Sequence, residues 1–298
     1  QVFSASPLPG QSGVAKTNAR QYGIFAQDDW SVNDHLTLNL GVRWDYEVNP
    51  SYTNFVTSQR VLDAINSPNP YAGAAPGSTY GDALAAGGVN LNNYVSDGHN
   101  RHTFKGEWQP RLGFSYDLFA DEAHVIHGGA GRAYDRNLYD YLQTEVTKQA
   151  LPQTTLRFNI PTHPCDPTSA TCVPWNPEFL NGQGALQNFL IGGNSGQEVD
   201  MLNNKLKAPY SDQYSLGMSN TIGDWQTDAT VTRVLSKDGF AFTLGNRYPN
   251  GAFFQNGSQP WDYPIPNVGG LILGDNGIET RTTQVLLSAQ KPYTKESG

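Results

Sequence analysis

Strict alternation of apolar and polar side chains is the feature that most constrains how this chain folds. Between positions 35 and 47 every second residue is apolar: Leu36, Leu38, Leu40, Val42, Trp44 and Tyr46. The residues between them are polar, charged or glycine. An α-helix would scatter the apolar set around its axis, whereas a β-strand places residues i and i+2 on one face. The segment is therefore predicted to form a long strand with one apolar and one polar face.

The same period recurs along the chain and predicts about seven strands of roughly 10 to 14 residues each. The predicted strands span residues 22–30, 35–47, 108–118, 123–134, 210–222, 225–235 and 279–291. Strands of soluble proteins average about 5–6 residues, whereas a tilted strand needs about 9–11 residues to cross a bilayer. Strand length therefore favours a membrane β-barrel.

The predicted connections alternate between short and long. Tight turns at residues 32–34, 119–122 and 223–224 alternate with long segments at 49–103, 136–209 and 236–278. Outer-membrane barrels have short periplasmic turns and long extracellular loops, because each hairpin must turn at one membrane surface or the other. The fold class predicted is all-β, a partial transmembrane antiparallel barrel.

In this arrangement the apolar faces contact lipid and the polar faces line a lumen. Aromatic residues near the strand ends are then expected at the membrane–water interfaces; they are Trp30, Trp44, Tyr46, Trp108 and Trp225. A soluble β-sandwich, whose apolar face is a core, is the alternative that the pattern leaves open.

Net charge and hydropathy argue against two other classes of protein, nucleic-acid-binding proteins and helical membrane proteins. The chain has 19 Lys and Arg against 27 Asp and Glu, a net charge of -8, which argues against a nucleic-acid partner. No apolar run approaches the 18 residues of a membrane helix.

Several strand motifs resemble those of one family. The segments Tyr22–Trp30 (YGIFAQDDW) and Leu36–Tyr46 (LTLNLGVRWDY) are similar to a hairpin of TonB-dependent outer-membrane receptors. Pro110–Asp117 and Gly128–Asp135 resemble the next hairpin of the same family, and so does the strand Pro209–Gly217. This last strand and the presence of long loops look most like the Oar-like branch. The resemblance covers the strands and not the long segments.

The resemblance implies energised uptake of a scarce substrate across the outer membrane of a Gram-negative bacterium. Its expected partners are outer-membrane lipid, an unknown extracellular ligand and the TonB complex, which acts through an N-terminal plug. The family's barrels have 22 strands, and residues 1–298 contain about seven and neither a plug nor a TonB box. We therefore expect residues 1–298 to be an internal piece of one barrel domain.

The only two cysteines, Cys165 and Cys172, lie in a proline-rich segment. Two cysteines in a polar loop predict a small disulfide loop in an oxidising compartment. A zinc site is the weaker interpretation, because two thiolates without a second pair rarely hold this metal.

One long segment carries aromatic residues among amides, a composition suited to stacking on sugars or docking peptides. The candidate binding residues are Tyr248, Phe253, Phe254, Trp261 and Tyr263. Ordinary packing over the barrel mouth is the competing interpretation.

Nothing in the sequence predicts an enzyme, a cofactor or a metal site. His124 and His127 are three residues apart on a predicted strand, so their side chains point to opposite faces and cannot chelate together. Signatures of nucleophile elbows, phosphate-binding loops and zinc proteases are absent from the 298 residues. The alternatives to an energised receptor are a passive porin and a secreted or surface β-rich module that binds carbohydrate or peptide.

Overall fold

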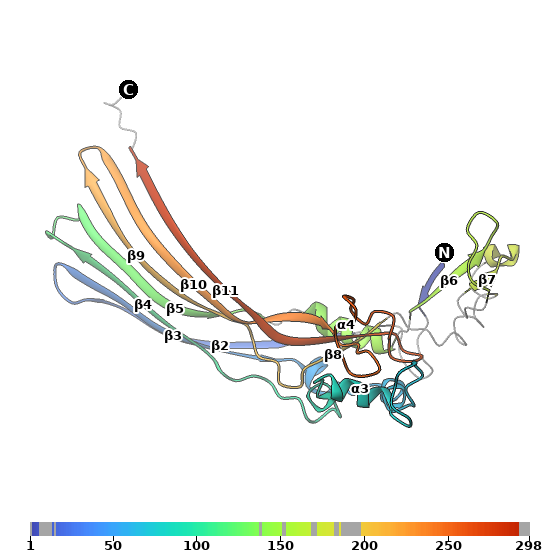
Figure 1. The fold of residues 1–298 in the computed structure, drawn as a ribbon. Coiled ribbons are helices and arrows are strands. Elements are labelled where there is room, and N and C mark those ends of the chain that lie inside the picture. The colour runs from blue at the N-terminus through green and yellow to red at the C-terminus, as the bar shows by residue number, and fades with distance from the viewer. Residues whose placement is uncertain are drawn as a thin grey trace.

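The structure is a computed structural model that describes residues 2–5, 14, 16–136, 139–150, 153–167, 172–181, 185 and 198–291. Its main element is a long, curved, eight-stranded sheet with the order β2-β3-β4-β5-β9-β10-β11-β8 (Figure 1). The strands are β2 (Arg20–Ser31), β3 (Leu36–Val48), β4 (Glu107–Asp117), β5 (His124–Tyr134), β8 (Glu198–Leu202), β9 (Tyr210–Ile222), β10 (Trp225–Leu244) and β11 (Gly270–Gln290).

All seven predicted strands are present, and they pair antiparallel with one another in the sheet. The prediction of an all-β, partial antiparallel barrel is confirmed. The eighth strand, β8, was not predicted, and it pairs parallel to β11 over Gly270–Gly274.

The predicted boundaries of the third long segment, 236–278, are wrong. β10 continues to Leu244 and β11 begins at Gly270, so the connection between them spans only residues 245–269. The register of this pair shifts between Ser236 and Phe240, where Asp238 has a φ of 55°. This irregularity resets the alternation of faces, which is why the period-2 pattern ends before the strands do.

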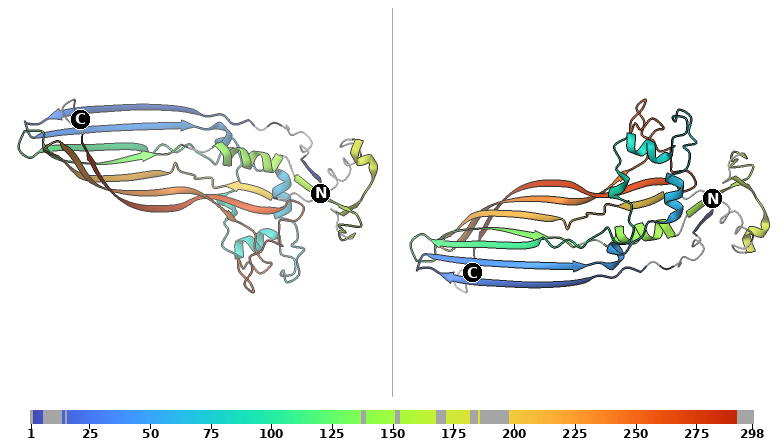
Figure 2. Two further views of the ribbon diagram at one scale, coloured as in Figure 1. Left: turned by 90° about the horizontal axis from the view of Figure 1, so that it is seen from above. Right: turned by 90° about the horizontal axis from the view of Figure 1, so that it is seen from below.

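The short turns and the long segments lie at opposite ends of the sheet (Figures 1 and 2). The long segments are not structureless: they contain the helices α1 (Pro50–Thr53), α2 (Gln59–Ile65), α3 (Tyr80–Ala86) and α4 (Tyr139–Ala150) and the 3-10 helices η1 (Leu91–Asn93) and η2 (Pro177–Asn181). Parts of the predicted segment 136–209 and both ends of the predicted domain 1–298 lie outside the described residues. No described helix is long and apolar enough to cross a membrane.

We call the described parts of residues 49–103, 139–150, 198–209 and 245–274 the cap, because they contain the main buried cores. The largest core cluster joins α2, α3, β8 and the start of β11 through side chains such as Val61, Leu84, Val199 and Leu271. Helix α3 begins at a capping box, in which Thr79 and Asp82 satisfy each other's backbone N–H groups. The cap is therefore a folded unit formed by four stretches of chain that are distant in sequence.

A second, three-stranded sheet lies beyond the cap and has the order β1-β6-β7. Its strands are β1 (Val2–Ala5), β6 (Gln153–Asn159) and β7 (Cys172–Pro174). Figure 1 shows this sheet at the end of the molecule opposite the short turns. We call it the tip.

Candidate functional site

The apolar face of the main sheet is exposed rather than buried in a core. Leu40 and Val42 are each 41% exposed, and Leu216, Val285 and Leu287 are exposed to 59%, 63% and 73%. The side chains predicted to face outward on β3 belong to none of the buried clusters, which lie in the cap and the tip. A soluble β-sandwich would bury this face, so the arrangement supports contact with lipid.

The predicted interface aromatics lie toward both ends of the apolar face. Trp30 and Trp225 flank short turns, and Trp44 stacks on Tyr46 and tilts against Trp108 near the other end. Trp30 pairs with Leu38 and Tyr22 with Tyr46, a separation of eight residues along the strand. At about 3.4 Å per residue this is roughly 27 Å, comparable to the apolar band of about 25 Å in membrane barrels. Their role at the two membrane surfaces stays a prediction.

The opposite face of the sheet carries a chain of polar contacts. On β3 the Arg43 guanidinium donates from Nε to both carboxylate oxygens of Asp45, at 2.8 and 3.0 Å. On β4 the Gln109 amide donates to the same carboxylate. On β2 and β3, Asn39 donates to Asp29 at 2.7 Å. These groups satisfy one another and present a hydrophilic surface, as a barrel lumen requires.

A second polar cluster on this face crosses an entire strand. His127 on β5 reaches Asp228 on β10 at 2.8 Å, although β9 lies between them. The crossing is possible because Gly217 on β9 lies between them: a Cβ there would approach the His127 ring to 2.6 Å. Ser219 and Thr230 also donate to the Asp228 carboxylate. The two histidines lie on opposite faces as predicted, since His124 contacts Asn220 instead.

The cap is organised around a fully buried ion pair that the sequence did not reveal. Arg101 donates to the two carboxylate oxygens of Glu145 on α4 at 2.7 and 2.8 Å, and both side chains are about 1% exposed or less. Burial raises the pKa of the Glu145 carboxyl, and hydrogen bonds from Arg101 and the Leu202 N–H oppose this rise. The two residues are 44 positions apart in segments without clear periodicity, so no sequence signal joins them.

The same guanidinium connects further parts of the cap. It donates to the Asn204 side chain at 2.8 Å and to the Leu202 carbonyl at 2.9 Å, and it lies over the Tyr52 ring at 4.8 Å. Tyr52 donates its hydroxyl to the Asn203 carbonyl, and its burial raises the pKa of the phenol to about 12. Arg101 therefore fixes the first long segment to α4 and to β8.

The five predicted binding aromatics divide into two groups. Tyr248 is 8% exposed and packs at 4.8 Å from the half-buried Tyr263, so these two rings contribute to packing of the cap. Phe253 is also half-buried and lies under the Arg247 guanidinium. Phe254 and Trp261 are 64% and 61% exposed. Only these two present most of their ring surface to a ligand.

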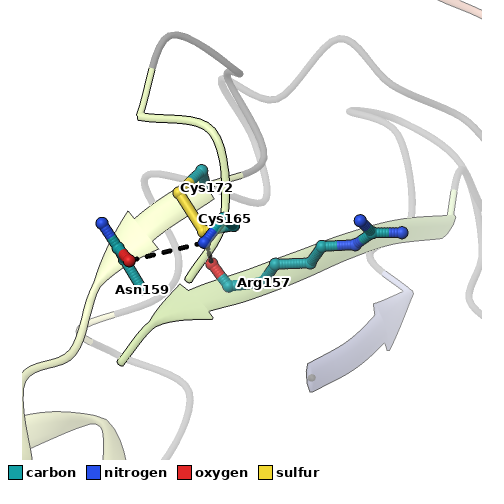
Figure 3. The surroundings of a disulfide bond; sticks show 4 residues. All are labelled: Arg157, Asn159, Cys165 and Cys172. Carbon is teal, nitrogen blue, oxygen red and sulfur yellow. Dashed lines mark hydrogen bonds between the residues drawn. A yellow bond between two sulfur atoms is a disulfide. The ribbon is translucent and has the colours of Figure 1, made fainter. Parts of the chain in front are cut away.

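The two cysteines form a disulfide in the tip, with the sulfur atoms 2.02 Å apart (Figure 3). The backbone N–H of Cys165 also donates to the Asn159 side chain at the end of β6. Next to the disulfide, Phe158 packs against Trp175 and Phe179, and Trp175 is 43% exposed. The disulfide closes a loop beside this aromatic cluster.

Solved structures of outer-membrane proteins are similar to this chain at low identity. One is the outer membrane transporter YddB from Escherichia coli, with 14% identity and a TM-score of 0.45 over 91% of this chain and 21% of that chain. The siderophore receptor PirA from Pseudomonas aeruginosa has 15% identity and a TM-score of 0.39 over 91% of this chain and 30% of that chain. The copper transporter OprC has 13% identity and a TM-score of 0.39 over 93% of this chain and 27% of that chain. The chain spans less than a third of the length of these three proteins. A search of curated protein sequences gave no match.

A family model gives the assignment. The model described as "Outer membrane beta barrel domain" matches residues 3–234, which is more than half of the chain. The match includes β2, β3, β4, β5 and β9, the strands that carry the alternating faces and the polar contacts described above. The chain belongs to the outer membrane beta-barrel domain family.

Proposed function

We propose that this chain forms the barrel wall and the extracellular cap of a receptor that takes up a scarce substrate with energy delivered by TonB. The observation that carries the proposal is the combination of a sheet with one lipid-compatible face and a folded cap at the end of its polar face. The strand motifs that resemble TonB-dependent receptors, and their Oar-like branch in particular, support the same assignment. In this proposal the cap selects the substrate and the polar face lines its path.

The exposed rings of Phe254 and Trp261 are the proposed first contacts for the ligand. Both lie on the connection between β10 and β11, and they leave large apolar surfaces in water, which is a feature of recognition sites. An aromatic ring beside amides suits a sugar or a peptide. We expect the double variant Phe254→Ala/Trp261→Ala to lose ligand binding while keeping its fold, because neither ring is part of a buried cluster.

Conductance distinguishes the receptor from a passive porin. The whole protein that contains this chain is purified in detergent and inserted into planar bilayers in KCl solution. A receptor occluded by a plug shows no steady conductance, whereas a porin conducts at once. Steady open-channel currents would contradict the proposed receptor.

Energy coupling is tested in cells. Uptake of a labelled substrate by cells that express the whole protein should stop when a protonophore collapses the inner-membrane proton gradient, while binding at the cell surface persists. Uptake that continues without the gradient would contradict the TonB-dependent step. Ferric siderophores, oligosaccharides and peptides are the probes to compare.

A further inference from the structure

We propose that Arg233 and Arg281 form a binding site for the phosphate of a lipid headgroup in the outer leaflet of the membrane. Arg233 lies on β10 and Arg281 on β11, two strands that run side by side from the short turns to the cap (Figure 1). Both side chains are exposed. The site is on the lipid-facing surface of the sheet, so it does not depend on the proposed uptake of a substrate.

Strand register places both arginines on the apolar face of the sheet. Arg233 pairs with Thr283 on β11, and Arg281 pairs with Leu235, two residues further along β10. Residues paired across strands, and residues two positions apart on one strand, share a face. Successive pairs from β10 through β9, β5 and β4 to β3 connect Arg233 to the exposed Leu40 of the apolar face.

The two arginines lie where the strands are expected to leave the apolar part of the membrane. Arg233 is eight residues after Trp225, which begins β10 at a short turn, and Arg281 pairs with Leu235, ten residues after Trp225. At about 3.4 Å per residue and a tilt of about 40°, these positions are roughly 21 and 26 Å from the turn along the membrane normal. The apolar band of membrane barrels is about 25 Å tall. Because a long arginine side chain extends toward the headgroups, both charges reach the outer membrane surface.

Below this level the lipid-facing surface of the two strands carries no charge. On β10 the residues of this face between the turn and Arg233 are Trp225, Thr227, Ala229 and Val231. On β11 the residues opposite them are Thr283, Val285, Leu287 and Ala289. Positive charge is therefore absent at the depth of the acyl chains and begins at the depth of the headgroups, where cations attract anionic lipid.

No acidic residue of the described chain neutralises the two arginines. Among the described residues neither guanidinium belongs to an ion pair, and Arg233 donates to the Thr283 hydroxyl. On the neighbouring strand β9, Asp212 already accepts two hydrogen bonds from Arg132, at 2.7 and 2.9 Å. Like charges on neighbouring strands destabilise each other unless an opposite charge compensates them.

The residues nearer the cap add no net charge to this face. Lys237 on β10 and Glu279 on β11 are the next charged side chains of the apolar face, and their charges are opposite. The whole chain has a net charge of -8, so two adjacent arginines without a carboxylate are a local exception. The surface around Arg233 and Arg281 therefore favours an anion.

A phosphate group suits the space between the arginines. Residues diagonal to each other on neighbouring strands are about 7–8 Å apart, so both guanidinium groups can donate to one phosphate. Arginine binds phosphate through charge-assisted hydrogen bonds that are frequently bidentate. Tyr214, which pairs with Arg233 from β9, is 48% exposed and suits the membrane–water interface. A lipid also supplies acyl chains for the apolar residues below, which free phosphate lacks.

Native mass spectrometry of the whole protein in detergent, titrated with diphosphoryl lipid A, tests the proposal. We expect the unmodified protein to bind this phosphorylated glycolipid, with affinity about tenfold lower in Arg233→Gln/Arg281→Gln. Arg111→Gln is the matched control, because it removes the same charge from an exposed residue on the polar face of the same sheet, and it should bind normally. Heat-modifiable migration on gels checks that each variant keeps a folded barrel.

Three outcomes would overturn the proposal. Equal binding of lipid A from which both phosphates have been removed would show that the phosphate is not recognised. Unchanged affinity in Arg233→Gln/Arg281→Gln, or the same loss in Arg111→Gln, would place the lipid elsewhere. Displacement of lipid A by millimolar inorganic phosphate would assign the site to a free anion.

Discussion

The main sheet and the cap follow opposite rules of burial. In β2 every side chain is exposed, and the apolar face of the sheet has no covering element among the described residues. In the cap, Val61, Tyr80, Leu84 and Leu271 are completely buried, and so is the Arg101–Glu145 ion pair. The sheet uses lipid as the solvent for its apolar side chains, whereas the cap must build its own interior as a soluble domain does. The sheet is therefore stabilised by its lipid surroundings, and the cap is stabilised by its own buried core.

The difference implies that substitutions of one type have different effects in the two regions. Removing apolar volume should destabilise the cap and leave the sheet almost unchanged, because lipid fills the space beside the sheet. Removing the buried charge of Arg101, which lies in the cap, should affect the cap alone. The following predictions test this contrast.

Arg101→Met should have the largest effect, about 3–5 kcal/mol of cap stability, because it leaves the Glu145 carboxylate buried without its partner. Protease sensitivity of the long segments measures cap opening, and heat-modifiable migration on gels measures the barrel. We expect only the first to change. The double variant Arg101→Met/Glu145→Leu should recover part of the loss, and equal damage in both assays would contradict the independence of the two regions.

Asp200 should make the cap less stable as pH rises. Burial, followed by repulsion from Glu198, raises the pKa of this carboxyl to about 7 from an ordinary value of 3.8. The folded cap thus holds a proton that the unfolded chain releases, so stability is highest below about pH 4 and decreases toward pH 7. The maximum effect is roughly 4 kcal/mol, at 1.36 kcal/mol per pKa unit.

Asp200→Asn should remove this pH dependence and raise the melting temperature of the cap at pH 8. Proteolysis at increasing temperature, at pH 5 and pH 8, measures both quantities. Lys148, which forms an ion pair with Glu198, is the nearby cation and remains unchanged in this variant. A melting temperature that still falls with pH in Asp200→Asn would show that another group is responsible.

Leu84→Ala should destabilise the cap by about 3 kcal/mol, because it opens a cavity in the largest core. The matched change in the sheet is Leu40→Ala, at a side chain that is 41% exposed. There we expect less than about 1 kcal/mol, since lipid tails are as apolar as leucine and fill the space. Chemical unfolding of the cap and of the barrel, followed separately, gives the two values, and similar losses at both sites would refute the contrast.

Thr79→Ala should have the smallest effect, about 1 kcal/mol, through loss of the capping box at the start of α3. The measurement is again the proteolytic midpoint of the cap. Ser31→Ala is a suitable control, because Ser31 is an exposed residue at the end of β2. No change in the barrel is expected from either variant.

The sheet could be predicted from the sequence because each strand and each turn is specified by residues that are close together in the chain. Alternation within ten residues specifies a two-faced strand such as 36–48, and two-residue turns such as 223–224 fix the pairing of neighbours. The prediction failed where a local defect interrupts the period, at Asp238 in β10. It also missed β8, a five-residue strand almost completely buried by the cap.

The cap and its sites could not be predicted in the same way. Tyr80 donates to the carbonyl of Tyr263, 183 residues away, and Arg60 donates to that of Asn267, 207 residues away. No periodicity marks such partners. The aromatics of the connection between β10 and β11 were recognised from composition alone, which could not separate the buried Tyr248 from the exposed Trp261.

These long sequence separations have a consequence for the order of folding. Hairpins of the sheet join residues close in sequence, so they lose little chain entropy when they form, whereas the cap must close loops of 100 to 200 residues. We therefore expect the cap to be the last part to assemble, after all three long segments have reached the outer side of the membrane. Maturation of the protein would then be visible as a late gain of protease resistance in a barrel that has already been inserted.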